Sequence, residues 1–284
     1  MATQFASRQP ELGMEKVMPT RQDSGYASPC DSPRLTVRLN DGNEIPQIAL
    51  GPNGQETEDA VIAALDAGYR HIDSAARYAN EEACGRALRK SEVFITTKLW
   101  DADHGYEATF KALCDSLEKF KLDYFDLYLI HSPPTTRRSA LLPGEPSRPL
   151  SVSASSQHLE ELMQETSVVP AVNQIEVHPF CQRQDLVDTC RKHGIAIEAY
   201  SPLARGNKLE DPTVGKIAEK YGKTPAQILL NWNASRGNIV LPKSLTAHRI
   251  KSNFESFDFE LSQEDIATID ALDENYVTGS LHKE

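Results

Sequence analysis

Hydrophobic and polar positions along the chain follow two periods in turn, one typical of helices and one typical of buried strands. Over residues 57–67, Val61, Ile62 and Leu65 predict one apolar helix face, and Gly68 predicts the end of that helix. Residues 125–130 form an almost unbroken apolar run, as in a strand that is covered on both faces. The repeated order of strand and helix predicts a parallel sheet with helices outside it.

The same reading extends over most of the chain. The spacing of Tyr106, Phe110, Leu113, Leu117 and Phe120 predicts one buried helix face over residues 106–121. An Asp-Gly pair at residues 41–42 predicts a hairpin before residue 50. The predicted strands are 47–50, 69–74, 93–99, 125–130, 172–177, 195–200 and 239–241, and the other predicted helices are 80–90, 182–192, 211–221 and a series from residue 224 to about residue 272.

Two helix starts carry specific capping signals. Asp211 before Pro212 is an N-cap followed by a first-turn proline. Thr224 with Gln227 three residues later is a capping box. Both signals predict where these helices begin.

The alternation predicts a (β/α)8 TIM barrel, an α/β fold, as one domain over residues 34–284. Residues 1–33 are polar and irregular, which predicts a disordered N-terminal tail. One strand of the eight must lie between His131 and Val172, where residues 132–149 contain five prolines. Residues 150–154 are the candidate for a short fifth strand. We therefore expect the unit made of the fourth barrel helix and the fifth strand to be missing or degraded.

Composition limits the kinds of binding partner and the cellular location that we expect. The formal net charge of −11 disfavours a nucleic-acid partner, since phosphates need a basic surface. The five cysteines are scattered and form no C-x-x-C pair, so we expect no metal site and a reducing, cytoplasmic location. No apolar run approaches the roughly 20 residues of a membrane helix, so we expect no membrane partner.

Reactive side chains follow three consecutive predicted strands. Asp73, Lys98 and His131 end these strands, and Tyr78 lies in the loop after the first of them. Barrel enzymes place catalytic groups at the C-terminal ends of their strands. Each residue by itself has an ordinary structural role, such as a helix cap, a solvated lysine or a packed ring, but together they favour catalysis.

Their types suit carbonyl reduction. A carbonyl that accepts hydride develops negative charge on oxygen and needs a proton. Tyr78 can donate that proton if a nearby ammonium, Lys98, stabilises the phenolate. Asp73 can hold Lys98 charged and in place, and His131 can orient the carbonyl oxygen.

The sequence resembles the aldo-keto reductase family. The matching segments include AGYRHIDSAARYANEEACGRALR, FITTKLW, LDYFDLYLIHS, VPAVNQIEVHP, GIAIEAYSPLARG and LPKSLTAHRIKSNF, in family order over about residues 35–272. The resemblance is nearest to fungal and bacterial reductases of the diketo-gluconate and xylose kind. It implies Tyr78 as proton donor, Lys98 and Asp73 as its partners, and His131 as substrate orienter.

The resemblance also implies NADPH as cofactor, extended across the barrel mouth. It implies that Gln174 bonds the nicotinamide carboxamide, that Tyr200 stacks on the ring, and that Lys243, Ser244 and Arg249 bind the 2′-phosphate. Two cations and a hydroxyl in LPKSLTAHR suit a phosphate monoester. The remaining implied contacts are Ser153 and Asn173 near the nicotinamide, Ser201 and Leu203 along the pyrophosphate, and Asn253 at the adenine.

The chain departs from the family pattern in three shortened segments: after Gly51, between Lys90 and Ser91, and between His131 and His158. Ala154 stands where the family has an asparagine for the carboxamide. The leading interpretation is a monomeric NADPH-dependent alditol-dehydrogenase-type reductase acting on a small-molecule aldehyde or ketone. The alternatives are a cofactor-binding regulatory or scaffold protein and an inactive reductase that has lost the segment after His131.

Overall fold

The computed structural model describes residues 36–52, 54–88, 92–132, 151–152, 154–165 and 169–279. The predicted tail, Asn53, Ser153 and almost all of the proline-rich segment lie outside these residues. So does the shortened junction of Lys90 and Ser91. Among the described residues, no helix is both long and apolar enough to cross a membrane.

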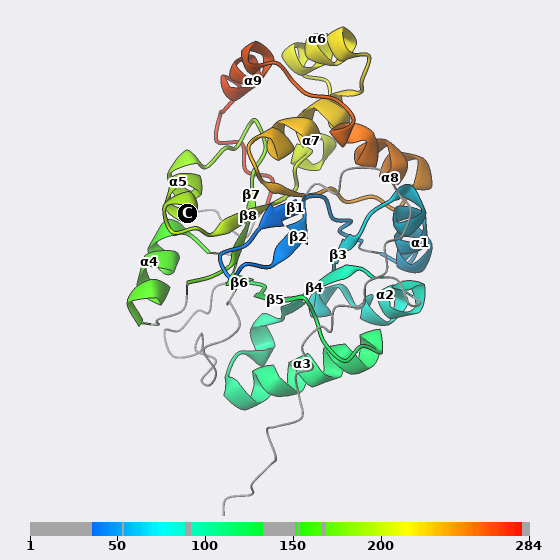
Figure 1. The fold of residues 1–284 in the computed structure, drawn as a ribbon, viewed down its shortest axis with the longest axis vertical. Coiled ribbons are helices and arrows are strands. Elements are labelled where there is room, and N and C mark those ends of the chain that lie inside the picture. Colours follow the sequence, from blue (N-terminus) through cyan, green and yellow to red (C-terminus); the bar gives the residue numbers. More distant parts are fainter. Residues whose placement is uncertain are drawn as a thin grey trace, which may run out of the picture. The chain divides into compact units, whose positions relative to one another are not determined.

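A parallel sheet forms the centre of the fold (Figure 1). Its seven strands are hydrogen-bonded in chain order, and every neighbouring pair is parallel. The strands are β3 (His71–Asp73), β4 (Phe94–Leu99), β5 (Leu127–Ile130), β6 (Ser151–Val152), β7 (Val172–Glu176), β8 (Ala196–Tyr200) and β9 (Ile239–Leu241). This arrangement confirms the predicted α/β class.

Residues 47–50 connect the two edges of this sheet. Ala49 N–H donates to Val240 O at 3.0 Å, and Val240 N–H donates to Gln47 O at 2.8 Å. On the other side, Leu50 N–H donates to His71 O at 3.0 Å, and parallel bridges join Ile48 to Val240 and Leu50 to Ile72. The segment predicted as the first barrel strand thus pairs with both β9 and β3.

The predicted short fifth strand is present as β6. Ser151 pairs with Leu129 of β5 and with Val172 of β7, and Val152 pairs with Asn173. Two residues therefore fill the place between β5 and β7. A short strand is therefore present at the predicted place, and the strand is two residues long.

Helices surround the strands (Figure 1). Their bounds are α1 (Thr57–Ala67), α2 (Glu81–Leu88), α3 (Tyr106–Phe120), α4 (Ser156–Glu165), α5 (Gln184–Lys192), α6 (Pro212–Tyr221), α7 (Pro225–Ser235), α8 (Ala247–Phe254) and α9 (Gln263–Asp270). Short 3-10 turns are η2 (Ala76–Tyr78), η3 (Asp101–Asp103), η4 (Ala204–Gly206) and η5 (Glu255–Phe257). The sequence reading did not predict α4, which follows β6 directly.

Capping explains where several helices begin and end. The Asp211 carboxylate accepts hydrogen bonds from Thr213 N–H and Val214 N–H, as predicted for α6. Thr224 and Gln227 form the predicted capping box of α7. Gly68 ends α1 at φ 108°, a left-handed conformation that costs glycine little.

Two predicted helix faces are only partly buried. Ile62 on α1 is 42% exposed, whereas Val61 beside it is fully buried. On α3, Tyr106 and Phe110 are 47% and 52% exposed, whereas Phe120 is 1% exposed. The predicted burial of the whole α3 stripe is therefore wrong for its first two turns. Spacing defines a helix face, but burial depends on the neighbour that packs against it.

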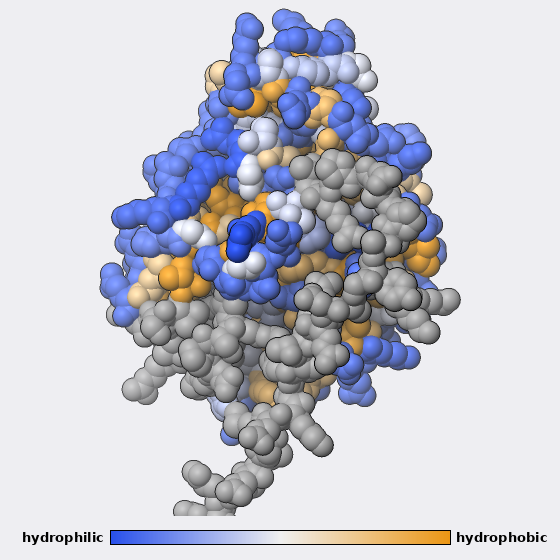
Figure 2. All heavy atoms as spheres, in the orientation of Figure 1, coloured by the Kyte–Doolittle hydropathy of each residue, from blue (hydrophilic) through white to orange (hydrophobic). Residues whose placement is uncertain are grey.

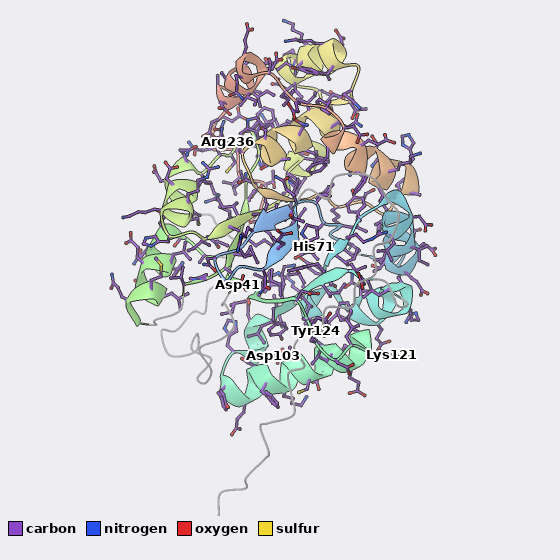
Figure 3. The ribbon with its side chains drawn as sticks, in the orientation of Figure 1. Asp41, His71, Asp103, Lys121, Tyr124 and Arg236 are labelled. Atoms are coloured by element: carbon purple, nitrogen blue, oxygen red, sulfur yellow. The ribbon has the colours of Figure 1, made fainter. Side chains whose placement is uncertain are left out.

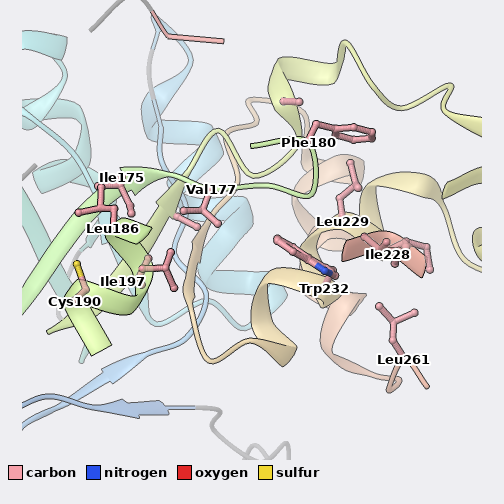
Figure 4. Close-up of a cluster of buried hydrophobic side chains, with 14 of the residues drawn as sticks. Ile175, Val177, Phe180, Leu186, Cys190, Ile197, Ile228, Leu229, Trp232 and Leu261 are labelled. Carbon is pink, nitrogen blue, oxygen red and sulfur yellow. The ribbon is translucent and has the colours of Figure 1, made fainter. Parts of the chain in front are cut away.

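The largest buried cluster lies between β7, β8 and the helices after them (Figure 4). Ile175 and Ile197 from the strands pack with Leu186 and Cys190 of α5, while Trp232 of α7 packs in the same cluster. On the face drawn in Figure 2, most of the described surface is hydrophilic. The apolar side chains of the strands are thus covered by helices, which leaves strand ends to carry polar groups.

An N-terminal hairpin lies against the sheet. It consists of β1 (Thr36–Arg38) and β2 (Glu44–Pro46), which pair antiparallel, as the Asp-Gly turn predicts. Pro46 O lies 3.4 Å from His71 Nδ1 at the start of β3. Figure 3 shows His71 among the strands beside this hairpin. The hairpin therefore covers the start of β3, while the predicted catalytic residue Asp73 lies at the other end of the strand.

Candidate active site

Four predicted side chains meet where consecutive parallel strands end. Asp73 is the last residue of β3, Lys98 is the fifth residue of β4, and His131 follows β5 directly. Tyr78 closes the short η2 turn that follows β3. Parallel strands end on the same side of a sheet, so their order alone brings these groups together.

Lys98 lies at the centre of the group. Its side chain is 3% exposed, and its Nζ donates to Asp73 Oδ1 at 2.5 Å and to Ser74 O at 2.8 Å. Nζ also lies 5.4 Å from the centre of the Tyr78 ring. An ammonium has three donors, and two are used here. The third has no partner among the described residues.

The groups around Lys98 keep its side chain protonated. Burial by itself lowers the pKa of the Lys98 ammonium. The negative charge of Asp73, the charge that Tyr78 carries when ionised and the hydrogen bond that Lys98 donates to Asp73 act in the opposite direction, and the net pKa is raised. Lys98 is therefore cationic throughout the neutral range and can stabilise a developing tyrosinate.

Three rings contact one another near the ends of β4 and β5. The Tyr78 and His131 rings are edge to face, with centres 5.8 Å apart. Trp100, just after β4, is also edge to face with His131 at 5.4 Å. Two of the predicted catalytic residues are thus in direct contact, and an aromatic wall adjoins them.

His131 is a neutral imidazole near pH 7. Burial, which is the largest cause, and the charges of Lys98 and Arg77 together lower its pKa to about 4. Its Nδ1 is buried and has no hydrogen-bond partner among the described residues. A neutral ring with a free nitrogen suits hydrogen bonding to a carbonyl oxygen rather than carrying charge.

Gln174 joins the site from the opposite part of the sheet. Its Nε2 donates to Asp73 Oδ2 at 3.0 Å and to Glu198 Oε2 at 2.8 Å. β7 and β3 are not neighbours in the sheet, so this contact requires strong curvature. Both Nε2 protons are used, which leaves the Gln174 carbonyl oxygen available to accept an amide proton.

Glu198 is a buried acid that the sequence reading missed. It lies on β8, is fully buried, and its Oε1 has no hydrogen-bond partner among the described residues. Oε1 is 3.7 Å from His71 Nε2, but burial lowers the pKa of His71 to about 3, so this contact is no ion pair. Burial and the nearby Asp73 charge raise the pKa of Glu198 to about 8.

This raised pKa predicts a pH-dependent stability. Between pH 4.5 and about 8 the folded protein holds a proton on Glu198 that the unfolded chain has lost, so stability falls as pH rises through this window. The slope through this group is at most about 1.4 kcal/mol per pH unit. Glu198→Gln stays neutral at every pH. We expect its free energy of unfolding to exceed that of the wild type most near the upper end of the window.

Urea unfolding at several pH values measures this effect. Glu260→Gln is the control, because Glu260 is exposed and its loss should give no pH-dependent difference. If Glu198→Gln tracks the wild type at all pH values, Glu198 does not hold the proton.

Asn173 has a different place from the one predicted. It is fully buried; its Oδ1 accepts from Ala154 N–H at 2.9 Å, and its Nδ2 donates to Ala154 O at 3.0 Å. Its Nδ2 also lies 3.5 Å from Cys190 Sγ on α5. Successive strand residues point to opposite faces, and Gln174 takes the face with Asp73. Asn173 therefore fastens the segment after β6 to β7 and does not join the site.

Three of the residues predicted to contact the nicotinamide ring and the pyrophosphate lie at the end of β8 or just after it. Tyr200 ends this strand opposite Glu176 of β7, and its hydroxyl is buried with no partner among the described residues. Ser201 follows with φ 48°, and Leu203 precedes the η4 turn. Ser153, the other predicted contact, lies outside the described residues.

The predicted phosphate-binding segment joins β9 to α8. Lys243 and Arg249 are exposed and form no ion pair in the part of the chain that the structure describes. Arg249 lies in the first turn of α8, which contains no acidic residue. Ser244 and Asn253 are 9% and 5% exposed. Two free cations near a helix N-terminus suit an anionic group.

Comparisons with known proteins relate this chain to one family. A model of the aldo/keto reductase family matches residues 45–274. An aldo-keto reductase of Mycolicibacterium smegmatis is 49% identical over 261 residues, which cover 85% of this chain and 94% of that protein. Glyoxal reductase of Bacillus subtilis is 42% identical over 261 residues, with 86% and 95% covered. The crystal structure of a Bombyx mori aldo-keto reductase in complex with NADP has a TM-score of 0.78 at 35% identity, covering 87% of this chain and 95% of that one.

The parallel α/β fold and these relatives define an oxidoreductase that acts on carbonyl groups. More specifically, the chain belongs to the aldo/keto reductase family.

Proposed function

We propose that this protein is an NADPH-dependent reductase that converts an aldehyde or ketone to an alcohol. The observation that carries the proposal is the convergence of Asp73, Lys98, Tyr78 and His131, with Lys98 bonded to Asp73 and facing Tyr78. This arrangement provides a proton donor, a cation that stabilises the anion it leaves, and a neutral ring to orient the carbonyl.

The described residues fit a dinucleotide phosphate. Gln174 keeps a free carbonyl oxygen beside Asp73. Tyr200 lies on the neighbouring strand β8, paired with Glu176 of β7, and supplies an aromatic ring. Lys243 and Arg249 supply unpaired cations, with the Ser244 hydroxyl between them in the sequence. When bound, the nicotinamide supplies the hydride. Gln174 and Tyr200 would hold it, Ser201 and Leu203 would line the pyrophosphate, and Asn253 would face the adenine.

The protein residues then act on the oxygen. His131 donates a hydrogen bond to the carbonyl oxygen and fixes its direction. The Tyr78 hydroxyl donates its proton to that oxygen as negative charge develops there. Lys98 stabilises the resulting tyrosinate, and Asp73 keeps the ammonium in position. Trp100 covers one side and excludes water.

We also propose that the sheet closes into an eight-stranded barrel, with residues 47–50 as its first strand. Two observations support closure: this segment bonds to both sheet edges, and Gln174 of β7 reaches Asp73 of β3. Closure would hold the tetrad in place despite the two-residue β6.

NADPH oxidation by purified protein tests the function. The panel should include glyoxal and methylglyoxal, because relatives carry the names glyoxal reductase and methylglyoxal reductase. Turnover supports the proposal. A change in protein fluorescence on NADPH addition, with no turnover of any carbonyl, would support the cofactor-binding scaffold instead.

Cofactor choice gives a separate prediction. Arg249→Ala should weaken NADPH binding by about 10- to 100-fold, because a charge-assisted bond to the 2′-phosphate is lost. NADH, which lacks that phosphate, should lose much less. Fluorescence titration with both cofactors measures the difference, and Arg38→Ala on exposed β1 is the control for loss of one positive charge. Equal weakening of both cofactors would show that Arg249 does not contact the phosphate.

A further inference from the structure

We propose that Arg77 gives this site a preference for carbonyl compounds that carry a carboxylate, an inference that rests on the proposed reductase function. Arg77 directly precedes Tyr78 in the η2 turn. The preferred substrates would be aldehydes or ketones with the carboxylate a short distance from the reacting carbonyl. The neutral members of the panel would lack this contact.

The position of Arg77 follows from a chain of ring contacts. Its guanidinium carbon lies 4.5 Å from the centre of the Trp100 ring. Trp100 is edge to face with His131, and His131 is edge to face with Tyr78. One aromatic ring therefore separates the guanidinium from the histidine that orients the carbonyl. A substrate oriented by His131 can extend past Trp100 to Arg77.

Arg77 is free to bind an anion. It is exposed, and it forms no ion pair with any acid among the described residues, including Asp101 and Asp103, which follow Trp100. By contrast, Arg236 pairs with Asp270 at 2.8 Å. The Arg77 guanidinium lies over the Trp100 ring and carries five N–H donors, and two of them can match the two oxygens of a carboxylate.

The local charge agrees with this assignment. Arg77 and Lys98 both contribute to the lowered pKa of His131, so two cations act on the place where the carbonyl oxygen would lie. The protein as a whole has a formal net charge of −11. An anionic substrate would therefore be attracted by this site and not by the general surface. If Arg77 served only to cover Trp100, it would stabilise the ring without favouring anions.

Two matched aldehydes test the proposal. 4-Carboxybenzaldehyde is an anion, and 4-formylbenzamide is its neutral isostere. The measured quantity is the ratio of their kcat/KM values in wild type, Arg77→Met and Arg77→Lys. We expect Arg77→Met to lower this ratio by about 10- to 100-fold, mainly through KM of the carboxylate. Arg77→Lys should recover part of it, because the charge remains but the two-pronged geometry is lost.

Comparison of the two aldehydes separates binding of the carboxylate from damage to Tyr78, which would lower both rates together. Lys111→Met is the control, since it removes one positive charge from exposed α3 and should leave the ratio unchanged. Added salt should lower the ratio in the wild type and have little effect in Arg77→Met. An unchanged ratio in Arg77→Met would overturn the proposal.

The test also separates this proposal from the proposed function. If the wild type reduces neither these aldehydes nor any other carbonyl of the panel, the reductase function fails. Calorimetric titration with 4-carboxybenzyl alcohol then tests Arg77 directly. Tighter binding to wild type than to Arg77→Met supports the carboxylate site, and equal affinities overturn it.

Discussion

Tyr78→Phe is expected to lower kcat by about 10²- to 10⁴-fold, the range usually supplied by a positioned general acid. The substitution removes only the hydroxyl. The ring that contacts His131 and faces Lys98 remains, so the shape of the site is kept. Without the hydroxyl, the neutral His131 can still orient the carbonyl, but it carries no extra proton near pH 7. The loss should therefore appear in kcat more than in KM.

Steady-state NADPH oxidation with one good aldehyde measures this loss, and fluorescence titration checks that NADPH still binds. Tyr124→Phe is a matched control, because Tyr124 is 36% exposed and lies just beyond α3 (Figure 3). It removes the same group from a tyrosine outside the site. Equal rates for Tyr78→Phe and wild type would refute the assigned proton donor.

The catalytic candidates at the ends of strands could be predicted from the sequence, because their placement follows from the order of strands and helices along the chain. Asp73, Lys98 and His131 end three consecutive parallel strands, and the parallel arrangement itself brings such ends together. Capping residues such as Asp211 and Thr224 also act locally, through bonds to backbone within three residues. Local chemistry and strand order were therefore enough for these features.

Side-chain direction was harder to predict. Asn173 and Gln174 are neighbours, so they must point to opposite faces, but only the strand register decides which one faces Asp73. The inward direction of the Glu198 side chain was equally hard to predict. A charged residue within the apolar run Ile197–Ala199 was a signal of a polar interior, yet its partner Gln174 lies on another strand.

Residues at the rim of the site were missed for a related reason. Trp100, which follows β4, contacts Arg77 in η2, and the two residues are far apart in the sequence. An aromatic residue two positions after Lys98 and a cation beside Tyr78 were visible in the sequence. Their stacking depends on loop conformation, which periodicity does not describe.

Lys98→Met is expected to reduce the free energy of unfolding by about 3–5 kcal/mol, the usual cost of removing one partner of a buried ion pair. Asp73 is 4% exposed and would keep, among the described residues, the Gln174 amide as its one side-chain donor, with Glu198 nearby. Urea unfolding with linear extrapolation measures this change. Turnover should be lost as well, since Tyr78 loses its ammonium.

A double-mutant cycle shows whether the charge left unpaired is the cause. In Lys98→Met combined with Asp73→Asn, no uncompensated charge is buried, so the double variant should be more stable than Lys98→Met alone. The exposed pair of Lys111 and Asp115 is the contrast, and its removal should change stability little because water screens both charges. If the losses at Lys98 and Asp73 simply add, the two residues do not stabilise one another. The short contact between them would then serve only to position Lys98 beside Tyr78, and the stability of the sheet would depend on its apolar packing.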